Sequence, residues 1–301
     1  MRLVDWQDSG RYFTYRGHEV FYRQAGRGEA LVLIHGFPSA SWDWHRLWED
    51  LGTRFEVVAP DMIGFGFSDK PRDYDYSLRD QATLHETLLT ELGISSVHVL
   101  SHDYGDSVAQ ELLARHAERR ERGEPGLEIR SVCLLNGGII PGTHRPLLIQ
   151  KLLLSPIGAL LAAFVSRRTL RKGFQRIFGP RTQPTDEQIQ EFWSLIEFNN
   201  GRRVAHKVSR YMSEREQQRD RWVGILQTTA VPLRLINGLA DPISGAHVAE
   251  HYRRLVPDPD VVGLEQIGHY PQIEAPQDVL AAFLAFVPRL RTTDGFEVGR
   301  R

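Results

Sequence analysis

The sequence predicts an α/β fold, with a mostly parallel sheet flanked by helices and an inserted helical cap. Short apolar runs such as residues 31–34 and 97–100 alternate with helix-like segments, which is typical of parallel strands covered on both faces. This alternation stops near residue 139, where a helix-rich block begins, and resumes near residue 231. The predicted division is a first core segment (1–138), a cap (139–225) and a second core segment (226–301).

The first core segment contains most of the expected strands. Residues 12–22 alternate and are expected to form a pair of strands, and residues 30–34 and 55–60 are apolar runs that each lead into a glycine-containing turn. A helix is expected over residues 78–92, ahead of another strand at 97–100. Loops at the carboxyl ends of such strands usually form the ligand site of an α/β fold.

Further strands are expected at residues 130–135, 231–236 and 261–264. The block between the first two of these is helical, rich in arginine and partly apolar, without a convincing strand. Because it connects two strands of one sheet, it is interpreted as a cap over the strand ends.

The most informative stretch begins at Val97 and continues to Arg115. Its apolar run ends in a tight turn, Ser101-His102-Asp103-Tyr104-Gly105, which is followed directly by a helical pattern. Small residues around one exposed side chain are typical of a nucleophile elbow, where strand and helix approach closely. The central residue here is Asp103 rather than serine, so the expected nucleophile is a carboxylate.

A carboxylate nucleophile forms a covalent ester, and hydrolysis of that ester requires further groups. Water must be activated by a base, the base must be oriented, and the oxyanion needs backbone donors. His269 and Asp241 follow later strand-like runs and are the predicted base and orienting acid, in the expected chain order. The predicted oxyanion donors are the backbone N–H groups of Phe37 and Tyr104.

Together these motifs resemble the α/β-hydrolase family, over about residues 30–285 with the cap included. They are similar to the branch with aspartate nucleophiles, which contains epoxide hydrolases and haloalkane dehalogenases, and within it to hydrolases related to the mesoderm-specific transcript protein. The segments that carry this narrower likeness are residues 101–106, 136–138, 143–148, 221–224 and 269–272. The resemblance implies the fold and a hydrolytic activity, and it does not define the substrate.

The leaving group separates the possible reactions. A halide requires N–H donors, whereas an epoxide oxygen requires an acid. Family dehalogenases carry tryptophan directly after the nucleophile, as many epoxide hydrolases also do, and Tyr104 occupies that position here. Tyr211 resembles one of the cap tyrosines that open epoxides, and a phenol is protonated at neutral pH. A plain packing role for Tyr211 is the alternative.

We therefore expect an epoxide hydrolase that converts a hydrophobic epoxide to a vicinal diol. A haloalkane dehalogenase and a non-catalytic binding homologue are the alternatives. Side chains expected near the substrate pocket are His35, His102, His144 and Tyr270, with His144 as a possible second acid and His35 as a possible support for its turn. The histidines at 85, 116, 247 and 251 lie in polar helical contexts and are expected in solvent. The role of Asp106 stays open.

The composition of the chain limits the kinds of partner that we expect it to bind. The chain has 37 Lys and Arg against 38 Asp and Glu, so no nucleic-acid surface is expected, and the mechanism requires no metal or organic cofactor. One cysteine, Cys133, and the absence of a signal-like start predict a cytoplasmic location. Basic residues of the cap, next to the apolar run at 147–165, suggest weak contact with a membrane surface or simply a solvated face: Arg167, Arg168, Arg171, Lys172 and Arg176. The oligomeric state is not predicted.

Overall fold

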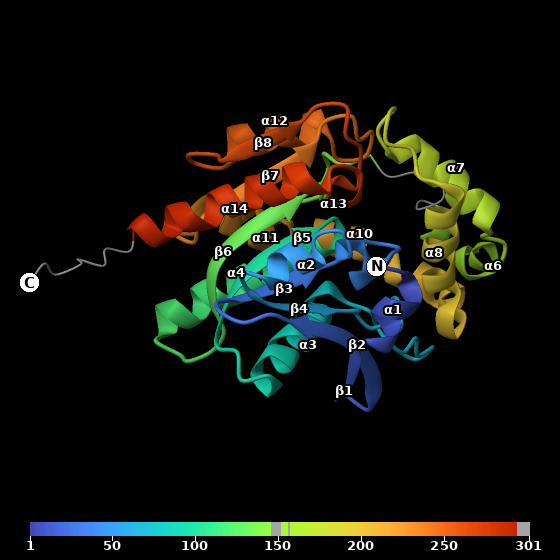
Figure 1. Ribbon diagram of the computed structural model, residues 1–301, viewed down its shortest axis with the longest axis horizontal. Coiled ribbons are helices and arrows are strands. Elements are labelled where there is room, and N and C mark those ends of the chain that lie inside the picture. The colour runs from blue at the N-terminus through green and yellow to red at the C-terminus, as the bar shows by residue number, and fades with distance from the viewer. Residues whose placement is uncertain (146–151, 156, 294–301) are drawn as a thin grey trace, which may run out of the picture.

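The computed structural model describes residues 1–145, 152–155 and 157–293, and its centre is one twisted sheet (Figure 1). Within these residues the sheet has eight strands in the order β1-β2-β4-β3-β5-β6-β7-β8. The pairs β1–β2 and β2–β4 are antiparallel, and all other pairs are parallel. The strands are β1 (Arg11–Tyr15), β2 (His18–Ala25), β3 (Ala30–Ile34), β4 (Glu56–Pro60), β5 (Ser96–His102), β6 (Glu128–Leu135), β7 (Leu233–Gly238) and β8 (Val261–Leu264).

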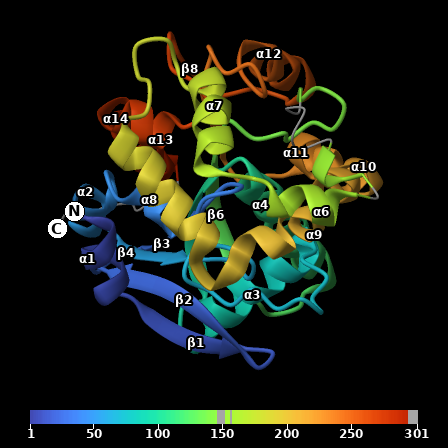
Figure 2. The same cartoon turned by 90° about the vertical axis from the view of Figure 1, so that its right-hand side faces the viewer.

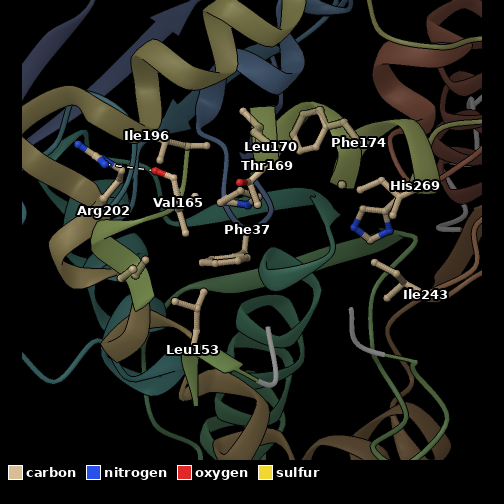
Figure 3. Close-up of a pocket in the computed structure, with 15 residues that line it drawn as sticks. Phe37, Leu153, Val165, Thr169, Leu170, Phe174, Ile196, Arg202, Ile243 and His269 are labelled. Carbon is tan, nitrogen blue, oxygen red and sulfur yellow. Dashed lines mark hydrogen bonds between the residues drawn. The ribbon is translucent and has the colours of Figure 1, made fainter. Parts of the chain in front are cut away.

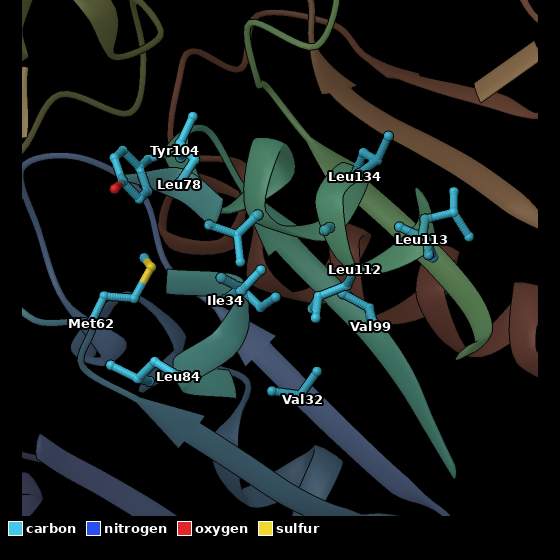
Figure 4. Packing of buried hydrophobic residues seen from close by; sticks show 14 of the residues in the cluster. Val32, Ile34, Met62, Leu78, Leu84, Val99, Tyr104, Leu112, Leu113 and Leu134 are labelled. Atoms are coloured by element: carbon cyan, nitrogen blue, oxygen red, sulfur yellow. The ribbon is translucent and has the colours of Figure 1, made fainter. Parts of the chain in front are cut away.

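Helices cover both faces of this sheet, as the apolar strand runs predict. Side chains of β3 alternate between the two layers, so that Val32 and Ile34 contact one cluster (Figure 4) and Leu31 and Leu33 contact the other. The first layer contains α3 (Leu78–Glu91), α4 (Tyr104–Arg122) and α12 (Ala246–Leu255). The second contains α1 (Leu3–Asp8), η1 (Ser41–Trp44), α2 (Trp48–Gly52) and α14 (Pro276–Thr293), and the short α13 (Pro271–Glu274) precedes α14.

The described residues between β6 and β7 form helices joined by turns and loops, and they contain no strand. Figures 1 and 2 show α6, α7 and α8 together on one side of the molecule. The elements are α6 (Gly158–Ala163), α7 (Arg167–Ile177), α8 (Asp186–Glu197), η2 (Phe198–Val204), α9 (Ala205–Val208), α10 (Tyr211–Gln217) and α11 (Arg219–Thr228).

Helix α11 packs directly against the core helix α4. The Trp222 indole N–H donates to Glu111 Oε2 at 2.9 Å, and Gln110 Nε2 donates to the Trp222 carbonyl at 3.0 Å. The expected boundary between residues 225 and 226 falls inside α11, and the division into core and cap stays a prediction. Within the described part of the chain, no helix is both long enough and apolar enough to cross a bilayer.

The expectation that His85 and His116 lie in solvent is wrong, because both are buried. His85 lies on the face of α3 that packs against the sheet, and its Nδ1 is 2.8 Å from the Gln81 carbonyl oxygen. Burial lowers the pKa of His85 to about 4. The polar residues that flank these histidines in sequence lie on other faces of their helices.

Candidate active site

Asp103 occupies the tight bend between β5 and α4. Its backbone angles, φ 47° and ψ −102°, lie outside the regions that non-glycine residues normally adopt. The turn is close to β3, since a Cβ on Gly105 would lie 2.4 Å from the Ile34 carbonyl oxygen and 2.7 Å from that of His35. The sequence pattern of small residues around Asp103 is therefore a steric requirement of this bend.

The Asp103 carboxylate is 5 % exposed and has different neighbours at its two oxygens. Oδ2 accepts a hydrogen bond from the Phe37 backbone N–H at 3.2 Å and lies 4.0 Å from His269 Nε2. Oδ1 lies 3.6 Å from Nη2 of Arg215. The Tyr104 N–H is the first of α4, where amides have no acceptor within the helix.

His269 is oriented by Asp241. Its Nδ1 lies 2.8 Å from Asp241 Oδ2, which assigns the Nδ1 proton to this hydrogen bond and leaves Nε2 facing Asp103. Asp241 also accepts from the backbone N–H groups of Ile243 and Ser244, at 2.8 and 3.1 Å. The Ser244 hydroxyl and the Asn136 amide complete its shell, at 2.7 and 3.0 Å.

Electrostatics distinguishes the two members of this pair. Burial alone would raise the pKa of Asp241, but the charge and hydrogen bond of His269 bring it below its usual value. Burial alone would lower the pKa of His269, but Asp241 and then Asp103 raise it to about 9. The imidazole of His269 is therefore protonated at neutral pH.

Two of the expected pocket histidines support neighbouring loops. His35 Nε2 accepts from the Met62 N–H at 3.0 Å, and its Nδ1 lies 2.9 Å from the Gly36 carbonyl oxygen. His102 Nε2 lies 2.7 Å from the carbonyl oxygen of His269. Burial lowers the pKa of both His35 and His102 to about 3, so both are neutral.

Three further predicted residues surround this centre. The buried ring of Tyr211 lies 5.8 Å from that of Phe37 and 5.0 Å from that of Tyr104, between centroids. The Tyr270 ring lies 4.8 Å from that of His102. His144 is half-buried, and burial together with the charge of Arg215 lowers its pKa to about 4.

Sequence reasoning missed Arg215. This side chain is 2 % exposed, and its Nη2 donates to the Asp103 main-chain oxygen at 2.7 Å. Its Nε donates to the Ser107 hydroxyl at 2.7 Å, and its guanidinium carbon lies 4.5 Å from the centroid of the Tyr211 ring. The one signal in the sequence was its spacing of four residues from Tyr211, which places both on one face of α10.

Asp106 lies behind the elbow and is fully buried. Its Oδ1 accepts from the Ser101 hydroxyl at 2.6 Å, and a Cβ on Gly137 would lie 2.2 Å from its Oδ2. Burial raises the pKa of Asp106 well above its usual range, which favours the neutral acid next to the Asp103 charge.

An apolar cavity of about 120 Å³ lies between helices α6 to α9 and the loops that follow β3, β7 and β8 (Figure 3). His269 and Phe37 reach it from the core, and Leu170 and Phe174 reach it from α7. The other lining residues are Pro38, Leu153, Ala162, Val165, Thr169, Gly173, Ile177, Ile196, Arg202, Ala205 and Ile243. Asp103, Tyr211 and the expected pocket residues His35, His102, His144 and Tyr270 are not among the described residues that line it, so the expectation that the last four face this cavity is wrong.

The chain belongs to the alpha/beta hydrolase family, whose model matches residues 31–283. It is 44 % identical to the mesoderm-specific transcript protein of Mus musculus over 299 residues, covering 95 % of this chain and 88 % of the relative.

Two solved structures share the fold. The epoxide hydrolase CorEH matches with a TM-score of 0.75 and 22 % identity, over 94 % of this chain and 99 % of that one. The haloalkane dehalogenase DbeA from Bradyrhizobium elkani matches with a TM-score of 0.80 and 20 % identity, over 95 % and 99 %. The fold alone therefore does not separate these two reactions.

Proposed function

We propose that this hydrolase is an epoxide hydrolase that works through a covalent ester on Asp103. The observation that carries the proposal is the setting of the Asp103 carboxylate at the strained bend. One oxygen accepts the Phe37 N–H at 3.2 Å and lies 4.0 Å from His269 Nε2. The close approach of these three groups supports the proposed roles of nucleophile, base and oxyanion donor.

In the first step, Asp103 Oδ1 attacks a carbon of the epoxide and the ring C–O bond breaks. The Tyr211 hydroxyl gives its proton to the ring oxygen, which becomes the hydroxyl of a hydroxyalkyl ester. Oδ2 becomes the ester carbonyl oxygen and stays on the Phe37 N–H. Oδ1 is taken as the attacking atom because the Phe37 N–H donates to the other oxygen, Oδ2.

In the second step, water attacks Cγ of the Asp103 ester. Formation of the ester removes the negative charge that helps to raise the pKa of His269, so the imidazolium releases its Nε2 proton to solvent and Nε2 can then accept a proton from the attacking water. His269 takes a proton back from solvent when the Asp103 charge returns at the end of the cycle. The tetrahedral oxyanion is stabilised by the N–H groups of Phe37 and Tyr104. When the tetrahedral intermediate collapses, the bond from Cγ to the diol oxygen breaks, and His269 donates its proton to that oxygen. Asp103 is left as a carboxylic acid, and its proton returns to the Tyr211 phenolate.

The cavity supports a hydrophobic substrate. The walls are mostly aliphatic or aromatic (Figure 3), and two of the lining residues, His269 and Phe37, lie next to the proposed nucleophile Asp103. Burial of apolar ligand surface there is favourable by roughly 25 cal/mol per Å².

A haloalkane dehalogenase is less well supported. Halide release requires N–H donors that point at the leaving group. No tryptophan or asparagine is among the described residues that line the cavity. Tyr104, at the position after the nucleophile, instead directs its hydroxyl to the Tyr76 carbonyl oxygen at 3.4 Å.

The test is a trapping experiment with H269Q and a lipophilic epoxide. Ester formation continues in this variant while hydrolysis stalls, so mass spectrometry is expected to find the substrate mass added to the peptide that contains Asp103. D103N is the control that must remain unmodified. An adduct from a haloalkane alone, with halide release, would favour the dehalogenase. No adduct from either class would favour a non-catalytic binding role.

A further inference from the structure

The cap carries an unusual group of exposed apolar side chains. Large apolar residues exposed elsewhere in the described chain are only Met1, Val4 and Tyr12. Five others lie within one short segment: Leu152 (38 % exposed), Leu154 (38 %), Ile157 (56 %), Leu160 (62 %) and Phe164 (73 %). A concentration of this kind marks an interaction surface, because single exposed apolar residues are common and clusters are not.

The same part of the chain has a strong charge bias. Residues 129–185 contain nine Lys and Arg and no Asp or Glu, although the whole chain has a net charge of −1. Helix α7 exposes Arg168, Lys172 and Arg176. Arg171 is not counted among these, because Asp186 of α8 binds it at 2.7 Å. A positive region therefore adjoins the apolar one.

The helices that carry the two regions lie on the same side of the molecule (Figures 1 and 2). Figure 2 looks onto this side and shows α6 and α7 at the front. The inner side chains of α7, Leu170, Phe174 and Ile177, are buried and line the cavity, so the basic side chains lie on its outer surface.

We propose that this face docks on a lipid bilayer with anionic headgroups. We define the cap face by its apolar residues Leu152, Leu154, Ile157, Leu160 and Phe164 and its basic residues Arg168, Lys172 and Arg176. The apolar side chains enter the boundary between headgroups and acyl chains, and the basic side chains contact lipid phosphates. We favour an anionic bilayer over a protein partner because its surface offers an apolar region for the apolar side chains and phosphates for the basic side chains.

Docking in this way brings the cavity close to hydrophobic substrate dissolved in the bilayer. This consequence rests on the proposed function. Leu153, Ala162 and Val165 belong to the same segment and line the cavity on its inner side. A lipophilic epoxide dissolved in the bilayer therefore lies one layer of side chains away from the cavity.

The test is co-sedimentation of the full chain with vesicles. The wild-type protein is expected to bind vesicles of mixed phosphatidylcholine and phosphatidylglycerol, to bind pure phosphatidylcholine much less, and to lose binding as salt is raised. The apolar double variant L160S/F164S and the charge-reversed R168E/K172E are each expected to weaken binding about tenfold or more. These positions are exposed in α6, α7 and the turn between them, so folding is preserved.

Matched controls separate this face from the rest of the surface. Y12S removes an exposed aromatic residue of β1, and R253E/R254E reverses two exposed charges of α12; both are expected to bind as wild type. D103N is also expected to bind normally, so failure of the proposed chemistry does not affect this test. The proposal is overturned by absence of binding to the mixed vesicles, by equal binding to neutral ones, or by sedimentation velocity showing that L160S/F164S abolishes a dimer instead.

Discussion

The buried guanidinium of Arg215 contacts Asp103 on the side away from Phe37. Its Nη2 donates to the Asp103 main-chain oxygen at 2.7 Å and lies 3.6 Å from Oδ1, while Ser107 holds Nε at 2.7 Å. A positive charge at this distance stabilises Asp103 when it is anionic and does less for the neutral ester. We therefore expect Arg215 to favour hydrolysis of the ester over its formation.

The variant R215M tests this expectation. Losing a charged hydrogen bond of roughly 1.5–3 kcal/mol slows ester hydrolysis about 10- to 100-fold, while ester formation is retained. Quenched-flow mass spectrometry of the Asp103 peptide should show the ester accumulating, and R215K should recover part of the rate because it keeps the charge. S107A is a milder variant, because it removes only the hydroxyl that accepts from Arg215 Nε and keeps the guanidinium charge. Slow ester formation in R215M, without accumulation, would contradict this role.

Tyr211 is predicted to act in the opposite half of the cycle. Removing its hydroxyl in Y211F takes away the proposed acid, so ester formation is expected to slow by about 100-fold or more. Hydrolysis of a preformed ester should change little, which single-turnover kinetics can resolve. Y252F is the matched control, since it removes another buried tyrosine hydroxyl on α12, away from the site. Equal losses in both variants would assign Tyr211 to packing.

The elbow geometry makes a prediction about stability. In G105A the new methyl group would meet the backbone oxygens of Ile34 and His35, at 2.4 and 2.7 Å. Neither backbone atom can move cheaply, so the free energy of unfolding in urea is expected to fall by about 2–3 kcal/mol. G224A is the control, because that helical glycine has open space around its Cα, and alanine there should add about 0.5–1 kcal/mol. Equal effects would contradict the close contact of β3 with the bend.

Buried neutral histidines predict acid sensitivity. His35 and His102 have pKa values lowered by burial to about 3, against 6.5 in the unfolded chain. Below pH 6.5 the unfolded chain binds protons that the folded protein does not, so stability is full above pH 6.5 and falls as the pH decreases toward 3. His269 acts in the opposite sense, because its pKa is raised to about 9: its contribution to stability is full below pH 6.5 and is lost as the pH rises toward 9.

Urea unfolding between pH 7 and 5 measures this effect. The expected loss is on the order of 1–2 kcal/mol per buried histidine by pH 5. H102Q should flatten the pH dependence, whereas H251Q, at an exposed position of α12, should leave it unchanged. A wild-type stability that is constant over this range would show that these histidines are accessible to protons.

Much of this architecture could be predicted from the sequence because its signals are local. Apolar runs predict β3 to β7; Asp103 directly follows β5, and Asp241 lies three residues after the end of β7. Parallel strands end at one edge, so these residues and His269 come together without further information. The structure brings all three within the distances given above.

The remainder depends on tertiary packing that no local pattern encodes. Arg215 lies in a polar helix and would normally be solvated, yet α10 buries it against Asp103 and Ser107. The position of His116 inside the protein likewise follows from how α4 packs. Whether a side chain lines the cavity or supports its wall, as Tyr270 does, depends on the cap helices rather than on its own neighbours in sequence.

A single turnover in water enriched in ¹⁸O, with enzyme in excess over a lipophilic epoxide, tests the covalent ester most directly. Water attacks Cγ of the ester in this account, so ¹⁸O is expected in the Asp103 carboxylate while the diol carries ordinary oxygen from that side chain. Mass spectrometry of the peptide and of the diol gives both answers at once. Appearance of ¹⁸O in the diol during the first turnover, with an unlabelled Asp103 peptide, would contradict the ester and mean that water opens the ring directly.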